Sequence, residues 1–441
     1  MNKNILRFAP SPTGYLHIGN ARTAIFNFLL AKKNDGEFIL RLDDTDRERS
    51  KQHFIDEIKH DLEWLGICWD RVEQQSTRLE RYSEILNNFI KDKSVYECFE
   101  TSVELDLKRK KQLNSGRPPV YDRQSLSLSE VDKEDLRKKE GSYWRFLLSG
   151  DKVEWEDKIA GKVEVQTNSV SDPVLIKANS QFLYTMASVI DDMDFKITDV
   201  VRGVDHLTNT AVQIEIFNRL TNNHPEFSHH SLIVDPAGNN FSKRTNSLSI
   251  KELRENGVEP GAICSILVNL GSGQKLDVNN DLHAFAKDFD LAKFNTSPTK
   301  FNKEDLLSVS RKALSKLKTN DISNVLSDLG VPDQDLESFW NMAKDNIDTR
   351  EELKSLWKMC QEGGESRVLP EDQDFIKTAL PLIPNSPRDQ KSWKLWTDQV
   401  KQITGRSGKS LYMPLRMYLT GNERGPDMNK LFPFLQNVQK I

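Results

Sequence analysis

Residues 5–46 read ILRFAPSPTGYLHIGNARTAIFNFLLAKKNDGEFILRLDDTD and carry the clearest structural signal in the chain. A short apolar strand begins near Ile5, and the prolines and glycine of residues 10–14 then force a tight turn. Apolar residues next recur with the spacing of one buried helix face, at Ile18, Ala21, Ile25, Phe28 and Leu29. A second strand, residues 38–42, leads into an acidic cluster, Asp43, Asp44 and Asp46. This strand–turn–helix–strand order predicts an open parallel sheet, whose ligands bind beyond the carboxyl ends of the strands.

The turn before the helix is a candidate anion site. A helix N-terminus offers free backbone amides and the positive end of the helix dipole, and Gly19 would let a ligand approach the backbone closely. His17 could donate from its imidazole to a phosphate that gains charge in a transition state. The plain alternative is a structural turn with a surface histidine, and the stretch is not a Walker loop.

The composition is that of an ordinary globular protein. The 441 residues predict two to four domains, and 62 basic against 66 acidic residues give a net charge of −4, which does not by itself indicate a nucleic-acid partner. No apolar run reaches the roughly 18 residues that span a bilayer, and residues 5–9 are too short for a signal peptide. Four scattered cysteines form no C-x-x-C pair. We expect a monomeric, cytoplasmic protein with reduced thiols and no membrane contact.

The rest of the chain shows helix and strand patterns like those of the first stretch, interrupted by an insertion and followed by a helical region. We expect Ser50 to cap a helix with apolar positions from Phe54 to Leu65, and residues 96–181 to form an α+β insertion with short strands. The nucleotide-fold pattern then resumes, and helices dominate from about residue 300 onward. The expected elements of this later part are helix 182–192, strand 197–201, helix 210–220, strand 231–234, a loop over 235–245 and helix 250–270.

The C-terminal part has an uneven charge. Residues 321–387 hold 6 Lys/Arg against 14 Asp/Glu, a net of −8, whereas residues 388–441 hold 10 against 4, a net of +6. Trp393, Trp396 and Tyr412 lie among the basic residues. Basic and aromatic side chains together suit phosphate contact and base stacking, so Arg406, Lys409 and Arg416 are candidate contacts to a nucleic acid. The equally weighted alternative is a solvated helix face over a tryptophan-filled core.

Several segments taken together resemble a known family. Three segments carry the resemblance: the RFAPSPTG-x-x-HIGN turn, the LRLDDTD strand end and the Ser242-Lys243-Arg244 loop. Five further segments occur in the order typical of the same family, namely PPVYDR, SDPVLIK, LYTMASVIDD, VVRGVDHLTNTAVQ and MPLRMYLTG. This ordered set resembles the glutamyl-tRNA synthetases, class I aminoacyl-tRNA synthetases of the bacterial, zinc-less type. The resemblance covers almost the whole chain.

The resemblance implies a role for each matching residue. His17 and Lys243 match catalytic positions. The positions that match ATP-binding residues are His17, Gly19, Asn20, Asp205, His206, Ser242, Lys243 and Arg244. The positions that match glutamate-binding residues are Arg7, Ala9, Ser11, Asp43, Tyr184 and Arg202.

Side-chain chemistry agrees with the implied glutamate site. A glutamate side chain is an anion, and arginine supplies a rigid planar fork for a carboxylate. Arg7 and Arg202 both sit near predicted strand ends, and Asp43 has the sign that suits an α-ammonium group. The alternative for either arginine is an ion pair with a nearby aspartate, for which Asp44, Asp46 and Asp205 are available.

The sequence departs from the family pattern in four places. Asp43 stands where many members carry glutamate, and Asn240 replaces the first lysine of the KMSKS loop. Val204 replaces a usual acidic residue, and Ser188 stands where some members have asparagine. Some members bind zinc in the insertion, but Cys98 is alone there, so neither structural zinc nor another bound metal site is expected.

The resemblance implies a Rossmann-type α/β class I catalytic domain, with an α+β insertion and an all-α C-terminal domain. The implied domains are a split catalytic domain over 1–95 and 182–240, an acceptor-stem-binding insertion over 96–181, a KMSKS and stem-contact segment over 241–315, and a helical anticodon-binding domain over 316–441. It also implies activation of L-glutamate by ATP with Mg²⁺, and transfer to tRNA-Glu or also to tRNA-Gln. Three rivals stay open: a glutaminyl enzyme of the same branch, a tRNA-modifying paralogue and a non-catalytic tRNA-binding protein, which Asn240 and Val204 would favour.

Overall fold

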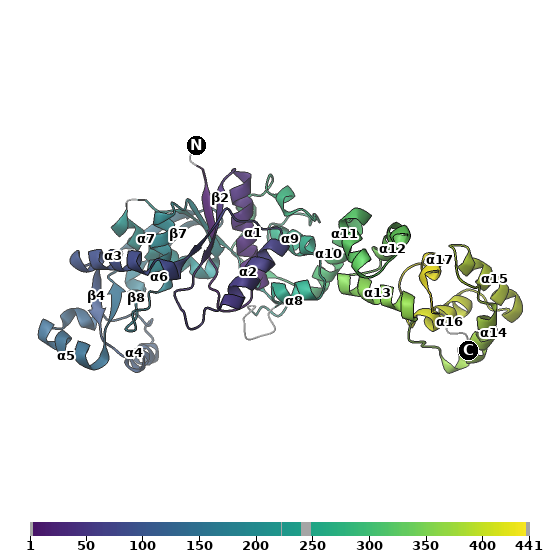
Figure 1. Ribbon diagram of the computed structural model, residues 1–441. Helices are drawn as coiled ribbons and strands as arrows, with labels where there is room; N and C mark the ends of the chain where they lie inside the picture. The colour runs from purple at the N-terminus through teal and green to yellow at the C-terminus, as the bar shows by residue number, and fades with distance from the viewer. Residues whose placement is uncertain (1–2, 222, 240–247, 438–441) are drawn as a thin grey trace. The chain divides into compact units, whose positions relative to one another are not determined.

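The computed structural model describes residues 3–221, 223–239 and 248–437, and divides into two compact units (Figure 1). The first unit consists of residues 1–252, 264–277 and 281–302, and the second of residues 253–263, 278–280 and 303–441. Each unit has its own hydrophobic core. The helical unit thus consists mainly of residues from 303 onward.

A seven-stranded sheet forms the centre of the first unit, with the order β3-β2-β1-β9-β10-β6-β7. All neighbours are parallel except β6 and β7. The chain fills one half of the sheet from β1 outward and then returns beside β1 with β9, so the strand order reverses between β1 and β9. Such a reversal opens a crevice at the carboxyl ends of the strands. The strands are β1 Ile5–Phe8, β2 Glu37–Leu42, β3 Arg71–Gln74, β6 Lys152–Asp157, β7 Gly161–Gln166, β9 Asp199–Gly203 and β10 Glu226–His230.

Helices cover both faces of this sheet (Figure 1). Phe28 of helix α1 packs edge-on against Phe38 of β2, whereas the next residue, Ile39, belongs to a core built with α3, α6 and α7. Successive strand residues point to opposite faces, so strand residues in step with Ile39 face α6 and α7. Arg7 is aligned with Ile39 in the β1–β2 register, so Arg7 faces α6. The helices are α1 Ile18–Lys33, α2 Gln52–Trp64, α3 Leu79–Lys91, α6 Tyr184–Asp194 and α7 Leu207–Leu220.

The segment over residues 96–181 is built from helices and short strands. Three antiparallel strands form a small sheet in the order β4-β5-β8, beside helices α4 and α5, which lie together at one end of the unit (Figure 1). The β6–β7 hairpin, although it falls inside the same segment, joins the central sheet through β10. The remaining elements here are β4 Val95–Cys98, α4 Ser102–Asn114, α5 Glu130–Glu140, β5 Tyr143–Phe146 and β8 Val174–Ile176.

The second unit is helical over its described residues from 303 onward. Trp393 and Trp396 are only 5% and 1% exposed and pack in its core, so the stacking role that the sequence allowed for these two residues is wrong. Tyr412, at 45% exposed, stays at the surface. The helices are α10 Lys303–Lys316, α11 Thr319–Asp328, α12 Leu336–Ala343, α13 Arg350–Glu362, α14 Gln373–Ala379, α15 Ser392–Thr404, α16 Lys409–Thr420 and α17 Met428–Leu431.

Three predicted elements differ from the structure. The strand predicted over residues 231–234 is the two-residue strand β11 (Ile233–Val234), paired with β12 (Thr299–Lys300), and the central strand β10 before it was missed. The predicted helix over 250–270 is two helices, α8 (Ile250–Glu255) and α9 (Pro260–Asn269), separated at Gly257. Helix α2 begins after Lys51, so Ser50 is not its cap.

Candidate active site

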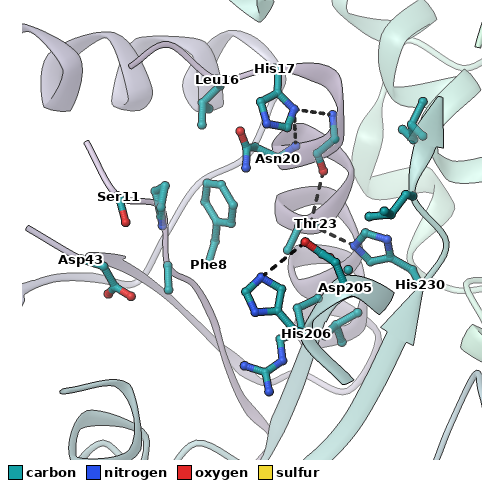
Figure 2. Close-up of a pocket in the computed structure, with 18 of the residues that line it drawn as sticks. Phe8, Ser11, Leu16, His17, Asn20, Thr23, Asp43, Asp205, His206 and His230 are labelled. Carbon is teal, nitrogen blue, oxygen red and sulfur yellow. Dashed lines mark hydrogen bonds and ion pairs between the residues drawn. The ribbon is translucent and has the colours of Figure 1, made fainter. Parts of the chain in front are cut away.

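A cavity of about 480 Å³ opens where the strand order reverses. It brings together every predicted ATP- or glutamate-binding residue that the structure describes. Figure 2 shows Ser11 and Asp43 on one wall and Thr23, His206 and His230 on the other. The predicted residues that line the cavity are Arg7, Ala9, Ser11, His17, Gly19, Asn20, Asp43, Tyr184, Arg202, Asp205 and His206.

His17 caps the helix that follows it. Its Nδ1 accepts hydrogen bonds from the backbone amides of Gly19 and Asn20, at 3.1 and 3.3 Å (Figure 2). The expectation that these helix-end amides are free is therefore wrong, because the imidazole occupies both. An accepting Nδ1 places the ring proton on Nε2. Gly19 is needed for this arrangement, since a Cβ there would lie 2.9 Å from the His17 ring.

Arg7 forms an ion pair, but with none of the three aspartates considered from the sequence. Its Nε and Nη2 donate to the two oxygens of Asp192 at 3.0 and 3.1 Å. Arg41, which is fully buried, donates to the same Asp192 at 2.6 Å and to both oxygens of Asp43 at 2.7 and 3.2 Å. Burial opposes the ionisation of Asp192, but Arg7 and Arg41 outweigh it and hold its pKa below the ordinary value.

Asp43 is less strongly held in its charged form. Burial raises the pKa of Asp43 to about 6, although the bidentate contact with Arg41 acts in the opposite direction. Asp191 extends this cluster of buried charges. It accepts hydrogen bonds from Gln75, Arg78 and Tyr82 at 2.7–2.9 Å. Three arginines and three aspartates thus compensate one another beneath the cavity. Ser188 contributes a hydroxyl that accepts from Arg41 at 3.1 Å.

Arg202 is in the opposite situation. It is 5% exposed, and it has no carboxylate partner among the described residues. Its acceptors are neutral: the Tyr184 hydroxyl at 2.7 Å, the Thr210 hydroxyl at 2.5 Å and Nε2 of His229 at 3.4 Å. Burial lowers the pKa of Arg202, because desolvation disfavours the charged guanidinium. A guanidinium has five N–H groups, so these contacts leave two for a ligand in the cavity.

Asp205 and His206 follow β9 directly and line the same cavity. Nε2 of His206 lies 4.0 Å from Oδ2 of Asp205 (Figure 2). Burial and then the charge of Arg202 lower the pKa of His206 to about 4, so this ring is neutral at pH 7. Gly203 leaves room for the Asp205 carboxylate, because a Cβ at residue 203 would lie 2.4 Å from it.

Two residues of the cavity wall, Thr23 of α1 and His230 of β10, were not found from the sequence. The hydroxyl of Thr23 lies 2.9 Å from Nε2 of His230, and Nδ1 of His230 donates to the Ser231 carbonyl at 3.0 Å. Burial lowers the pKa of His230 to about 3. Arg22 donates to Ser231 and to the Leu270 carbonyl at 2.7 Å, which ties α1 to a segment far along the chain.

Ser242, Lys243 and Arg244, with Asn240, lie outside the described residues. The residues on either side of this stretch are at the cavity. Ile233 lines it, and the backbone amide of Ile250 donates to the Leu16 carbonyl at 2.8 Å, so that Ser249 pairs with His17.

Cys98 has no metal-type surroundings. Its thiol lies 3.5 Å from the Tyr121 hydroxyl, and burial raises its pKa to about 11. Residues 3–221, 223–239 and 248–437 contain no group of three or more His, Cys, Asp or Glu side chains that could hold a metal ion. Nor does any helix in these ranges have the length and apolar character needed to cross a membrane.

The fold and the cavity are those of a class I aminoacyl-tRNA synthetase, and the chain belongs to the family described as tRNA synthetases class I (E and Q), catalytic domain, which matches residues 4–308. A curated relative, glutamate–tRNA ligase 2 of Ruegeria sp. (strain TM1040), is 50% identical over 98% of each chain. Glutamate–tRNA ligase 1 of Ruegeria pomeroyi is 48% identical over 100% of this chain and 99% of its own.

Solved structures of similar proteins cover both units. A glutamate-tRNA synthetase from Elizabethkingia anophelis is 26% identical, with a TM-score of 0.80 over 99% of this chain and 97% of its own. A glutamate tRNA ligase from Elizabethkingia meningosepticum, solved with its amino acid, is 27% identical, with a TM-score of 0.79 over the same shares. The predicted fold class and family are confirmed.

Proposed function

We propose that this chain is a glutamate–tRNA ligase that activates L-glutamate with ATP and transfers it to tRNA-Glu. The observation that carries the proposal is Arg202, a buried guanidinium with neutral partners that lines a cavity at the nucleotide-fold crevice. A buried charge without a partner is costly, and a bound carboxylate would compensate it. The side-chain carboxylate of glutamate fits this requirement, whereas the amide of glutamine does not.

The remaining cavity residues suit the other parts of the two substrates. Asp43 and Tyr184 would orient the amino acid with Arg7, Ala9 and Ser11. The nucleotide would lie toward His17, whose Nε2 carries the proton in the tautomer described above. The other residues proposed for ATP are Gly19, Asn20, Asp205, His206, Ser242, Lys243 and Arg244.

The chemistry needs no protein nucleophile. An oxygen of the α-carboxylate of glutamate attacks the α-phosphorus of ATP, the bond from this phosphorus to the oxygen that bridges the α- and β-phosphates breaks, and pyrophosphate leaves. The terminal ribose hydroxyl of tRNA then attacks the acyl carbon and releases AMP. His17 and Lys243 would stabilise phosphate charge in the first step. Mg²⁺ would enter with the ATP phosphates, because this ion is usually bound by substrate phosphates together with only one or two carboxylates.

Further proposals follow from the same family membership. We propose that residues 96–181 contact the acceptor stem, residues 241–315 the stem, and residues 316–441 the anticodon arm through Arg406, Lys409 and Arg416. Use of tRNA-Gln as a second acceptor is also proposed, as are action as a monomer, a cytoplasmic location and the lack of structural zinc.

The test is ATP–pyrophosphate exchange with purified full-length protein and tRNA. We expect exchange with glutamate and much less with glutamine, followed by charging of tRNA-Glu with labelled glutamate. Exchange with glutamine alone would identify the glutaminyl rival. Tight tRNA binding without any exchange would identify the non-catalytic rival.

A further inference from the structure

We propose that Asp157 and His229 act as a positioning pair that orients Arg202 toward the cavity without a neutralising carboxylate contact, and so sets the choice of glutamate over glutamine. The inference deepens the proposed function and rests on it. Neither residue lines the cavity, and neither belongs to a motif that the sequence singled out. Both act through Arg202.

The first half of the pair is a fixed carboxylate at the end of β6. Oδ1 of Asp157 accepts from the backbone amides of Ile159, Ala160 and His229, at 3.0, 2.9 and 3.1 Å. Oδ2 lies 2.5 Å from Nδ1 of His229. Burial opposes ionisation of Asp157, but His229 and these amides outweigh it and lower its pKa. An ionised Asp157 can only accept, so the ring proton of His229 must lie on Nδ1.

The second half of the positioning pair is His229, which faces Arg202 with Nε2, the ring nitrogen opposite Nδ1. With the proton on Nδ1, Nε2 of His229 carries a lone pair, and it lies 3.4 Å from Nε of Arg202 and 2.8 Å from the Thr210 hydroxyl. His229 is 0% exposed, so water cannot replace this acceptor. In the other tautomer an Nε2 proton would point at the N–H groups of the guanidinium. Asp157 therefore decides that His229 accepts from Arg202 rather than repels it.

The separation between the Asp157 carboxylate and the Arg202 guanidinium matters for ligand binding. A carboxylate in direct contact with Arg202 would orient it but also neutralise it, as Asp192 does for Arg7. The imidazole orients Arg202 while keeping the Asp157 charge one ring away. A guanidinium oriented in this way favours a carboxylate ligand over a neutral amide.

Two substitutions of nearly equal size separate the two ring nitrogens. In His229→Gln the amide oxygen can reach the position of Nε2, so an acceptor for Arg202 remains. In His229→Asn the amide nitrogen can donate to Asp157 from the position of Nδ1, but the acceptor is removed. We expect His229→Asn to raise the KM for glutamate by roughly 10- to 100-fold, with ATP KM and kcat less changed, and His229→Gln to stay within about threefold of wild type.

Asp157→Asn tests the other partner. Three backbone N–H groups require oxygen at Oδ1, so the new NH₂ group must face His229 and reverse its tautomer. We expect the same rise in glutamate KM as in His229→Asn, together with a smaller ratio of glutamate to glutamine use in pyrophosphate exchange. Thermal unfolding of all three variants identifies any that fail to fold.

A measurement on the wild type does not depend on the variants. In full-length protein labelled with ¹⁵N-histidine, we expect the signal that disappears in His229→Gln to have an unprotonated Nε2 at pH 7. A protonated Nε2, or equal glutamate KM in His229→Asn and His229→Gln, would overturn the inference. Wild-type protein without glutamate-dependent exchange would instead overturn the proposed function, and it would be seen before any variant is made.

Discussion

At the scale of single residues, the two arginines of the cavity have opposite energetic roles. Arg7 is part of a compensated network with Asp192 and Arg41, whereas Arg202 is buried among neutral acceptors. A compensated pair stabilises the fold only as long as both partners stay. A buried charge without a carboxylate is retained at a cost, which points to binding rather than to stability.

The first prediction compares Arg7→Met with Arg202→Met. Arg7→Met leaves Asp192 with one cation fewer in the interior, and we expect the free energy of unfolding to fall by about 3 kcal/mol. Arg202→Met removes a costly charge, and we expect a change within about 1 kcal/mol while glutamate-dependent exchange is abolished. Urea denaturation and exchange measure the two quantities. Equal destabilisation by both substitutions would contradict the distinction.

The second prediction concerns His230 and pH. Its folded pKa of about 3 lies below the value of about 6.5 in an unfolded chain, so the unfolded state binds more protons between these pH values. Stability must therefore fall as pH drops below about 6.5. Arg22, His229 and His206 all act on this ring in the same direction.

We expect His230→Met to be less stable than wild type near pH 7, because methionine cannot replace the hydrogen bonds with Thr23 and Ser231. Its stability should also change less steeply with pH, by up to about 1.4 kcal/mol per pH unit between pH 6.5 and 4. Urea denaturation at several pH values measures this slope. An unchanged slope would mean that the wild-type ring takes up a proton without a cost to folding.

The sequence predicted the residues of the cavity better than their partners. Residues such as His17, Asp43 and Arg202 lie at strand or helix ends, and they match binding positions of the family that the chain resembles. Their partners Asp192, Arg41 and His229 match none of the expected binding positions, and a charged or polar residue outside such positions is easily taken for a solvated one. The missed strand β10 has the same cause, since Ser228, His229 and His230 look polar but are buried, and both histidines are hydrogen-bonded.

At the scale of elements, the side chain that caps helix α1 also lines the cavity. His17 accepts from the amides of Gly19 and Asn20 through Nδ1, and the same ring lines the cavity. Side chains that cap a helix contribute about 1 kcal/mol to stability. Stability and activity at this position can therefore be separated by substitution.

The third prediction compares His17→Asn with His17→Ala. Asparagine is a good N-cap, but its side chain is too short to place an N–H group where Nε2 of the imidazole lies. We therefore expect near-normal stability with impaired ATP-dependent activation. Alanine removes both roles, and stability should fall by about 1 kcal/mol as well. Thermal unfolding and pyrophosphate exchange measure the two effects. Full activity of His17→Asn would show that the ring is only a cap.

At the scale of the whole molecule, charge is distributed by segment rather than evenly. The net −8 of residues 321–387 and the net +6 of residues 388–441 lie within one helical unit. Two of the three proposed tRNA-binding side chains also hold local structure. Arg406 bonds to Asp372 and stacks 4.1 Å from the Phe375 ring, and Arg416 donates to the carbonyls of residues 422 and 426.

The fourth prediction neutralises Arg406, Lys409 and Arg416 together by substitution with glutamine. We expect weaker tRNA binding and a flatter dependence of log K on log salt, by about 0.9 for each phosphate group that the protein no longer neutralises. Lys354, Arg367 and Lys377, exposed in the acidic segment, give a control triple with the same charge change. The control should alter the salt slope less, and unfolding measurements show whether the local bonds of Arg406 and Arg416 matter for stability. An equal effect of both triples would mean that only net charge counts.

The described segments before and after residues 240–247 contact each other directly. Ile250 bonds to Leu16, Lys251 pairs with Glu57 at 3.2 Å, Arg22 holds Leu270, and β11 pairs with β12. These contacts join residues 1–239 to residues 248–441 independently of the peptide bonds between them. Fragments 1–239 and 248–441, produced together as separate polypeptides, should therefore associate as a split protein, and the intervening octapeptide could be supplied on either fragment to tell its chemical contribution from its connecting one.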